Sequence, residues 1–430
     1  MADILKIGVA GLGTVGGGVL RLLERHADRI AERAGRRIVV TAVSARDRRR
    51  DRGMELTGVR WFQDAVAMAA DPEVDVVVEL IGGADGVARA LIEAAVARGK
   101  PVVTANKALL ALHGTSIARA AEAAGVPLAF EAAVAGGIPI IKGLREGLAA
   151  NEISRVYGIL NGTCNYILST MRREQREFGE VLAEAQRLGY AEADPSFDVD
   201  GIDAAHKLAV LSAAAFGTEV DFASVHVEGI RHVSALDIAY ADELGYRIKL
   251  LGIARTTAHG IEQRVHPCMV PVATPIANVE GVFNAVVAEG DFVGRVVMEG
   301  RGAGAGPTAS AVVADLIDVA RGRTVPTFGR PVAALRPAAQ APMELHRGCY
   351  YVRLMVLDRP GVIADVAAAL RDEEVSLESM LQRGRAPGEA VPVVLTTHET
   401  EEAGMRRALA RITALGTVIE PPRSIRIEDL

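Results

Sequence analysis

The sequence predicts an α/β protein in three parts: a doubly wound parallel sheet, an α+β region and a compact βαββαβ module. Three observations support this order. Near-continuous apolar strands alternate with helical patterns over residues 1–130, which is typical of a parallel sheet covered on both faces. The rhythm changes after residue 130, and a new alternating pattern begins near residue 350. The length, 430 residues, is enough for two or three such domains.

The first part, residues 1–130, contains five strand-like runs separated by Ala-rich helical patterns. The predicted strands are 4–10, 37–44, 74–80, 101–103 and 127–130. The first helix is expected over 14–33, with one apolar side. Doubly wound α/β is therefore the expected class of this domain.

The middle part, residues 131–306, mixes helices with isolated strands, as α+β domains do. Helices are predicted at 137–149, 163–176, 178–188 and 203–216, and strands at 152–160 and 290–298. A glycine-rich run at 302–306 then leads into a helix over 307–321 that begins with proline.

The last part begins with residues 324–348, which carry four prolines and few strand or helix signals, so we expect a linker. Residues 349–430 then predict a ferredoxin-like βαββαβ module. Its strands are expected at 350–357, 376–382, 391–398 and 418–427, and its helices at 362–372 and 401–412. We expect this module to be separable, with few contacts across the linker.

Composition excludes several classes of protein. Lys plus Arg is 48 and Asp plus Glu is 54, a net charge of −6 that argues against a nucleic-acid partner. Cys164, Cys268 and Cys349 show no metal-site or disulfide spacing, which favours a reducing compartment. No apolar run reaches the length of about 18 residues that spans a membrane. We therefore expect a soluble cytoplasmic protein with no membrane partner.

A glycine motif follows the first predicted strand and opens the first helix: Gly11-Leu12-Gly13-Thr14-Val15-Gly16. Gly11 permits a tight turn, Gly13 lets the backbone approach a pyrophosphate, and Gly16 lets the helix pack closely on the strand. The helix N-terminus offers free N–H groups to phosphates. A plain glycine-rich turn is the alternative, but the strand–turn–helix context favours a Rossmann-type dinucleotide-binding domain over residues 1–130.

The end of the second strand bears on the choice between NADP and NAD. NAD sites usually place Asp or Glu there to hold the ribose, whereas this chain has Ser44 and then Arg46. A guanidinium suits the 2′-phosphate of NADP. Asp47 could still face the ribose, and a solvated basic loop explains the arginine equally well, so NAD stays open.

Carboxylates crowd a loop before residue 203, and Asp203 and Lys207 then lie one helical turn apart. A routine helix ion pair explains this spacing, and acidic residues favour helix N-termini in any case. A lysine beside several carboxylates also suits a proton donor or a site for an ammonium group.

This stretch resembles the signature of the homoserine dehydrogenases. The matching positions are Ala185, Gly189, Tyr190, Asp194, Pro195, Asp198, Gly201, Asp203 and Lys207. Segments 103–107, 130–139, 161–166 and 302–308 are also similar, so the resemblance covers about residues 1–325. Residues 357–362 resemble the start of an ACT domain, a small-molecule-sensing module, which assigns residues 349–430 to regulation.

The resemblance implies an NAD(P)-dependent oxidoreductase that interconverts L-homoserine and L-aspartate 4-semialdehyde in threonine, methionine and isoleucine biosynthesis. It implies a homodimer or homotetramer formed through the middle domain, and a return of helix 307–321 to the first domain. It also implies L-threonine as an effector. Its carboxylate is expected at the turn of Asp358, Pro360 and Gly361, before a helix.

The resemblance also implies a role for each matching residue. Lys207 is the implied general acid, with Asp203 beside it and Lys107 between nicotinamide and substrate. The implied substrate contacts are Glu192, Asp198, Gly162, Thr163 and Tyr190. The implied cofactor contacts are Lys107 and Gly304, in addition to the glycine motif and Arg46 inferred above from the residues themselves. The implied ligands of a Na⁺ or K⁺ ion, mainly carbonyl oxygens, are Glu131, Val134, Gly136 and Ile138.

Two rival interpretations remain beside this one. Cys164 could form a thioester, as in aldehyde-oxidising enzymes, but hydride transfer needs no thiol and no histidine is nearby in the sequence, so a buried cysteine is expected. A non-catalytic sensor would use only the C-terminal module. Lys107, Glu192 and Lys207 together favour an enzyme.

Overall fold

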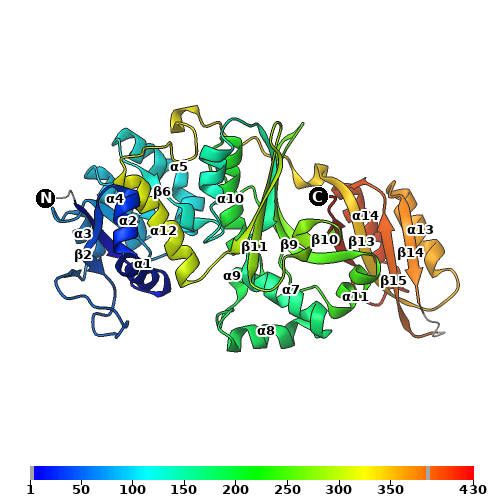
Figure 1. Ribbon diagram of the computed structural model, residues 1–430. Coiled ribbons are helices and arrows are strands. Elements are labelled where there is room, and N and C mark those ends of the chain that lie inside the picture. The colour runs from blue at the N-terminus through cyan, green and yellow to red at the C-terminus, as the bar shows by residue number, and fades with distance from the viewer. Residues whose placement is uncertain (1–3, 384–387) are drawn as a thin grey trace.

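The computed structural model describes residues 4–383 and 388–430, and its parts follow one another along the molecule (Figure 1). The N-terminal part is a six-stranded parallel sheet in the order β3-β2-β1-β4-β5-β6, which confirms the doubly wound class. Its strands are β1 Ile4–Ala10, β2 Arg37–Ser44, β3 Arg60–Phe62, β4 Val76–Glu79, β5 Val102–Thr104 and β6 Leu128–Ala129. The central strand β4 is buried throughout, because helices cover both faces.

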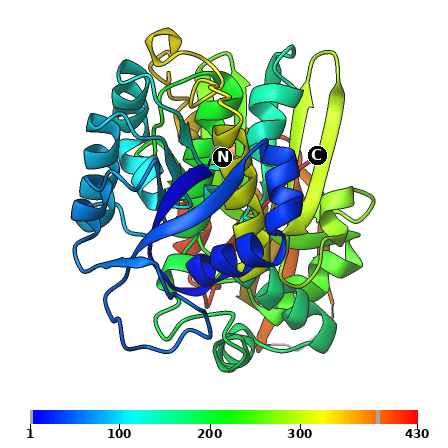
Figure 2. The ribbon, with the colours of Figure 1, turned by 60° about the vertical axis from the view of Figure 1, so that its left-hand side comes forward.

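The helices of this part are α1 Thr14–Arg25, α2 Ala27–Ala34, α3 Ala65–Ala69, α4 Val87–Ala97 and α5 Lys107–Ala123. The single helix expected over 14–33 is two helices, because the backbone at His26 is not helical. A late helix, α12 (Ala305–Ala320), packs against α1 and α2 (Figure 1 and Figure 2). Gly18 permits this contact, since a Cβ there would lie 2.4 Å from the Ala305 carbonyl oxygen.

The middle part begins with a short 3₁₀ turn, Glu131–Ala133, and continues through short and long helices into long strands. Its helices are α6 Ile140–Lys142, a π-helical turn Gly143–Gly147, α7 Gly162–Glu174, α8 Phe178–Arg187, α9 Ser196–Val199, α10 Ile202–Phe216, α11 Ala235–Glu243 and a 3₁₀ turn Pro275–Asn278. Its strands are β7 Ile153–Ile159, β8 His226–Val227, β9 Tyr246–Thr257, β10 Gly260–Pro271, β11 Phe283–Gly290 and β12 Gly294–Arg301.

Two hairpins in this part differ from the sequence prediction. The strand expected over 290–298 is interrupted by the turn 291–293 between β11 and β12, and residues 294–298 are the first part of β12, which starts at Gly294 with φ 69°. The hairpin of β9 and β10 was not predicted. Both of its strands are buried over much of their length, so they lack the alternation of apolar and polar residues that marks a half-buried strand.

The C-terminal module has the predicted βαββαβ order, with one additional two-residue strand, β16, before its second helix. Its elements are β13 Arg347–Leu357, α13 Val362–Asp372, β14 Leu377–Gln382, β15 Ala390–Thr397, β16 Thr400–Glu401, α14 Glu402–Thr413 and β17 Arg423–Ile427. β17 pairs with β13 on one side and with β10 on the other. One eleven-stranded sheet therefore runs from the middle part into the module (Figure 1).

The expectation of a linker with few contacts across it is wrong. Within 324–348, Phe328 is fully buried and its ring lies 5.5 Å from that of Phe130, and two 3₁₀ turns, Val332–Ala334 and Met343–Leu345, follow. Beyond it, Arg353 of β13 pairs with Asp237 of α11 at 2.7 Å. No helix in the described part of the chain is both long and apolar enough to cross a membrane.

Candidate active site

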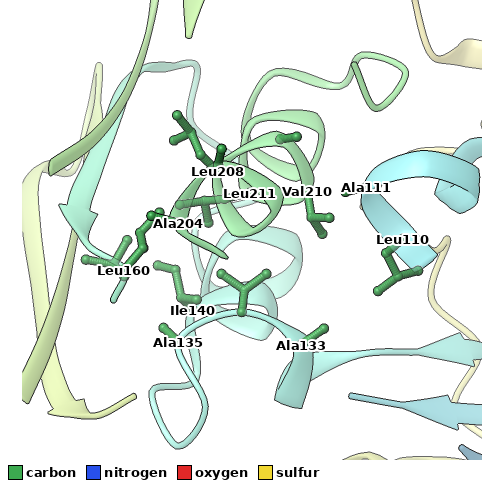
Figure 3. Close-up of a cluster of buried hydrophobic side chains, with 14 of the residues drawn as sticks. Leu110, Ala111, Ala133, Ala135, Ile140, Leu160, Ala204, Leu208, Val210 and Leu211 are labelled. Carbon is green, nitrogen blue, oxygen red and sulfur yellow. The ribbon is translucent and has the colours of Figure 1, made fainter. Parts of the chain in front are cut away.

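Helix α10 carries two charged residues into the core. Its residues Asp203 to Ala213 are all buried, and Figure 3 shows Ala204, Leu208 and Leu211 of this helix beside Leu160 and Ile140. The side chains of Asp203 and Lys207 are 6% and 11% exposed. Such burial excludes the routine surface ion pair, which leaves both side chains in water.

The two nitrogen–oxygen contacts of Lys207 define its orientation. Its Nζ donates to Asp203 Oδ2 at 2.6 Å and to the Leu160 carbonyl oxygen at 2.8 Å. An ammonium group has three N–H donors, so one remains for a substrate. The other oxygen of Asp203, Oδ1, lies 3.3 Å from Lys107 Nζ. One carboxylate therefore holds both candidate lysines.

Lys107 reaches this point from the first domain. It is the first residue of α5, whose N-cap Asn106 accepts a hydrogen bond from Leu109 N at 3.1 Å. The same Asn106 donates to the Gly83 carbonyl oxygen at 2.7 Å. The Lys107 ammonium also lies 5.8 Å from the centre of the Phe197 ring. The site thus lies between the dinucleotide-type sheet and α10.

Asn161 connects the two carboxylates of the site. Its Nδ2 donates to Asp198 Oδ1 at 2.8 Å and to Asp203 Oδ2 at 2.9 Å. Its Oδ1 accepts from Cys164 N at 2.8 Å and so caps α7. Sequence reasoning assigned Asn161 no role. The available signal was an Asn directly before a helix, a common N-cap.

Burial and charge act in opposite directions on these carboxyl groups. Burial raises the pKa of Asp203, but Lys207 and Lys107 outweigh it and hold the pKa at about 2. Burial also raises the pKa of Asp198, and there the hydrogen bond from Asn161 offsets only part of the effect. Asp203 is therefore a permanent anion at neutral pH.

The N-terminus of α7 forms one wall of the site. Gly162 is its first residue, and a Cβ there would lie 2.7 Å from the Val282 carbonyl oxygen. Thr163 Oγ1 donates to the Tyr190 carbonyl oxygen at 2.8 Å. The first N–H groups of a helix have no intrahelical partner and are free for an anion.

Two residues considered in the sequence analysis, Cys164 and Glu192, do not belong to the cluster of lysines and carboxylates. Cys164 is buried, and burial raises the pKa of its thiol well above the usual value, so it is not a thiolate nucleophile. The side chain of Glu192 is exposed, and among the described residues it makes no hydrogen bond or ion pair with Lys107 or Lys207. The structure brings together Lys207, Asp203, Lys107 and Asp198, but not Glu192.

The glycine motif has the geometry of a dinucleotide cradle. Gly11 has φ 99°, and a Cβ on it would lie 2.3 Å from the Leu80 carbonyl oxygen. A Cβ on Gly16 would lie 2.0 Å from the Gly11 carbonyl oxygen. Gly13 instead faces open space, before the free N–H groups of Thr14 and Val15 at the start of α1. A pyrophosphate fits there, and Gly304 caps α12 nearby with φ 112°.

The basic segment after β2 folds back onto the glycine motif. Arg52 Nε donates to the Leu12 carbonyl oxygen at 3.3 Å, and its guanidinium lies 5.6 Å from the centre of the Trp61 ring. Arg48 lies over the same ring at 6.0 Å. Arg46 is exposed and lies two residues beyond the end of β2. Sequence reasoning named Arg46 but not Arg52, whose position depends on the fold of the loop.

The suggested cation loop lies beside the interdomain contact. Glu131 is buried, and its carboxylate accepts from Ile141 N at 2.9 Å and Lys142 N at 2.7 Å. Burial and the nearby Asp315 raise the pKa of Glu131 to about 7. Gly136 has φ 54° and packs so closely that a Cβ would lie 2.3 Å from the Gly302 carbonyl oxygen. The Glu131 side chain thus holds the loop, leaving its carbonyl oxygen as the available ligand.

Family models match most of the chain. The model described as homoserine dehydrogenase, NAD binding domain, matches residues 11–131, and that of homoserine dehydrogenase matches residues 139–317. The ACT domain model matches residues 350–417. The three matches follow the three parts of the fold.

Relatives agree over the full length. A homoserine dehydrogenase of Pseudomonas aeruginosa is 49% identical over 433 residues, 99% of this chain and 99% of that protein. The crystal structure of a homoserine dehydrogenase from Thiobacillus denitrificans has a TM-score of 0.94 at 49% identity, covering 99% of both chains. A hyperthermophilic archaeal homoserine dehydrogenase in complex with NADPH has a TM-score of 0.64 at 25% identity, covering 75% of this chain and 99% of that one.

Proposed function

The chain belongs to the homoserine dehydrogenase family, and on that premise we propose how its residues carry out the reaction. It is an NAD(P)-dependent oxidoreductase that interconverts L-homoserine and L-aspartate 4-semialdehyde. The observation that carries the proposal is the buried cluster in which Asp203 holds Lys207 and Lys107 between the two domains.

Lys207 is the general acid and base. A bound nicotinamide supplies or accepts the hydride at C4 of the substrate. The third N–H of Lys207, free of Asp203 and Leu160, gives its proton to the aldehyde oxygen during reduction. In the oxidation of homoserine, the same nitrogen takes the proton back. Asp203 fixes the direction of the Lys207 ammonium, and Lys107 polarises the oxygen from the first domain.

The α-amino and α-carboxyl groups of the substrate are held by opposite walls. The free N–H groups of Gly162 and Thr163 at the start of α7 receive the carboxylate. Asp198 attracts the ammonium, and the exposed carboxylate of Glu192 is its proposed second contact. Tyr190, whose ring lies 4.8 Å from that of Tyr166, covers the site.

NADP is the proposed cofactor, with NAD as the second candidate. The segment 11–16 receives the pyrophosphate, Gly304 contacts the cofactor from α12, and Arg46 receives the 2′-phosphate. Arg52 lies close by, because it donates to the carbonyl oxygen of Asp47 at 2.6 Å. The NADPH complex of the archaeal relative supports this choice. A Na⁺ or K⁺ ion is proposed at the backbone carbonyls of Glu131, Val134, Gly136 and Ile138.

Regulation and assembly complete the proposal. An amino-acid effector, L-threonine, acts through the C-terminal ACT module, and the chain forms a homodimer or homotetramer. The domain division that we propose is 1–130 with α12 for the cofactor, 131–306 for the substrate and 349–430 for the effector.

The test is oxidation of L-homoserine followed by the absorbance of the reduced nicotinamide, with NADP and NAD side by side and with or without L-threonine. We expect turnover with NADP and loss of turnover in Lys207→Ala. Absence of turnover with either cofactor in the folded wild-type protein would refute the proposed function.

A further inference from the structure

A cavity of about 410 Å³ lies between the middle part and the last strand of the C-terminal module. The middle part lines it with residues of the segment Glu228 to Asp237, and β17 lines it with Arg423, Ser424 and Ile425. We call it the junction cavity. Its volume lies within the range of small-molecule sites, about 300–1,000 Å³. None of the proposed catalytic or cofactor residues lines it.

Among the described residues, some charged or polar side chains around the junction cavity have hydrogen-bond partners and others have none. Asp237 is fully buried and paired, with Arg353 Nε at 2.7 Å and the Tyr351 hydroxyl at 3.1 Å. Arg423 and His232, in contrast, form no side-chain hydrogen bond or ion pair with any described residue. A half-buried guanidinium beside a cavity suits a planar carboxylate, to which it can donate two hydrogen bonds.

An acidic and an apolar wall complete the junction cavity. Glu228 binds Arg426 at 2.9 Å and His226 at 2.7 Å, yet its side chain remains 40% exposed. Its carboxylate has lone pairs to spare for one more donor. Val233 and Pro267 add an apolar surface. The cavity thus offers a site for a carboxylate, a site for a cation and a small apolar wall.

We propose that the junction cavity binds a small α-amino acid with an uncharged side chain. The carboxylate pairs with Arg423, the ammonium lies against Glu228, and the side chain contacts Val233 and Pro267. This inference rests on the proposed amino-acid regulation and places its ligand away from the turn at 358–361.

Segment 228–231, which forms one wall of the junction cavity, is also hydrogen-bonded to α9, the short helix that contains Asp198. Ile230 N donates to the carbonyl oxygen of Val199 at 2.8 Å; Val199 is the last residue of α9 and directly follows Asp198. Gly229 packs so closely that a Cβ would lie 2.3 Å from the same oxygen. Arg231 donates to Ser196 Oγ at 3.0 Å and pairs with Asp200.

A ligand in the junction cavity can therefore act on the active site. Asp198 shares Asn161 with Asp203, which holds Lys207, so a shift of segment 228–231 moves the acidic cluster. A ligand that favours one spacing between β17 and this segment shifts the balance between two states of the turn. The expected kinetic effect is a change in KM for homoserine, because Asp198 binds substrate.

Calorimetric titration of the full-length protein with L-threonine, L-valine and L-methionine tests the proposal. L-threonine amide and N-acetyl-L-threonine remove the carboxylate charge and the ammonium charge in turn. We expect at least one of the amino acids to bind, and both derivatives of L-threonine to bind at least tenfold more weakly than their parent.

Arg423→Ala locates the site, and Arg371→Ala is its matched control. Arg371 belongs to the same module, is 75% exposed and, among the residues that the structure describes, pairs only with the adjacent Asp372. We expect Arg423→Ala to weaken binding about tenfold or more, because a charge-assisted contact is lost. We expect kcat without effector to be unchanged, and His232→Ala to weaken binding less.

Three outcomes overturn the inference. They are no binding of any of the amino acids at about 10 mM, equal binding by Arg423→Ala and Arg371→Ala, and binding that is lost only when Gly361 is changed to Ala. Homoserine turnover of the unliganded protein is measured separately. Amino-acid binding without turnover would refute the proposed reaction and leave the junction cavity standing.

Discussion

At the scale of single residues, one carboxylate organises the site. Asp203 accepts from Lys207 and Asn161 on one oxygen and faces Lys107 on the other. The low pKa of about 2 means that this arrangement keeps its charge over the whole working range of pH. Any change of activity with pH near neutrality therefore comes from groups other than Asp203.

Lys207→Ala is expected to lower kcat by a factor of about 10² to 10⁴, because a positioned proton donor is lost. Affinity for NADPH, measured by fluorescence titration, is expected to stay within about twofold, since Lys207 binds no part of the cofactor in the proposed mechanism. Lys100→Ala, in the first domain and away from the cluster, is the control. Retention of more than a tenth of the wild-type kcat would remove Lys207 from this role.

Arg46→Ala is expected to weaken NADP far more than NAD, because only NADP carries the 2′-phosphate. The loss of a charge-assisted hydrogen bond is about 1.5–3 kcal/mol, roughly ten- to a hundredfold in affinity. Arg49→Ala, in the same exposed basic segment, is the matched control. Equal losses for NADP and NAD would assign Arg46 to a solvated loop.

At the scale of elements, helix N-termini place the reactive groups. Asn106 caps α5 and so positions the next residue, Lys107. Asn161 caps α7 and donates a hydrogen bond to Asp198. Both caps also bond to a second segment: Asn106 to Gly83 and Asn161 to α10. The same side chains thus stabilise a helix and hold its start against a second segment of the same domain.

Asn106→Ala is expected to lower the free energy of unfolding by about 0.5–2 kcal/mol, the usual value of an N-cap. It is also expected to raise KM for homoserine, because Lys107 follows it directly. Urea denaturation and steady-state kinetics measure the two effects. Ser116→Ala, on the exposed part of the same helix, is expected to change neither. A stability loss with an unaltered KM would separate the cap from the placement of Lys107.

At the scale of the whole molecule, the C-terminal module is joined to the enzyme by sheet pairing and by buried charge. β17 pairs with β10, and Arg264 of β10 binds Glu428 at 2.9 Å just beyond β17. Arg353 and Asp237 form a further buried pair across the same junction. Breaking a buried pair leaves an uncompensated charge, which is strongly destabilising.

A chain ending near residue 340 is therefore expected to lose its fold along with its regulation. Removal of residues beyond 340 uncovers the edge of β10 and takes Glu428 away from Arg264 and Arg353 away from Asp237, both of which are buried. We expect insoluble protein, or a melting temperature far below that of the full chain in calorimetry. A soluble truncated chain with full homoserine turnover would show that the module is separable after all.

Acid is expected to destabilise the same junction. Burial raises the pKa of Glu262, but His346 and Arg264 outweigh it and lower the pKa to about 2. Because this folded-state value lies below that of the unfolded chain, the stabilisation is complete above about pH 4.5 and is lost as the pH falls toward 2. Melting curves between these values should show a smaller pH dependence in Glu262→Gln than in wild type. Identical slopes would contradict the assignment.

The sequence alone determined much of this protein. Apolar strands alternating with helices predicted the parallel sheet, and the glycine motif predicted its cradle, because both depend on local spacing. The spacing of Asp203 and Lys207 placed them on one helix face. These features depend on residues close together in the sequence, so the spacing of apolar residues and the turn-forming glycines are enough to predict them.

Only the tertiary structure decided the rest. It places Lys107 beside Asp203 and lets Asn161 donate hydrogen bonds to the carboxylates of both Asp198 and Asp203. It also leaves Glu192 exposed to solvent. It also paired β17 with β10, which turned an expected linker and separable module into one continuous sheet. Such contacts join segments far apart in the chain, and neither the period nor the composition of one segment records which distant segment will bury it.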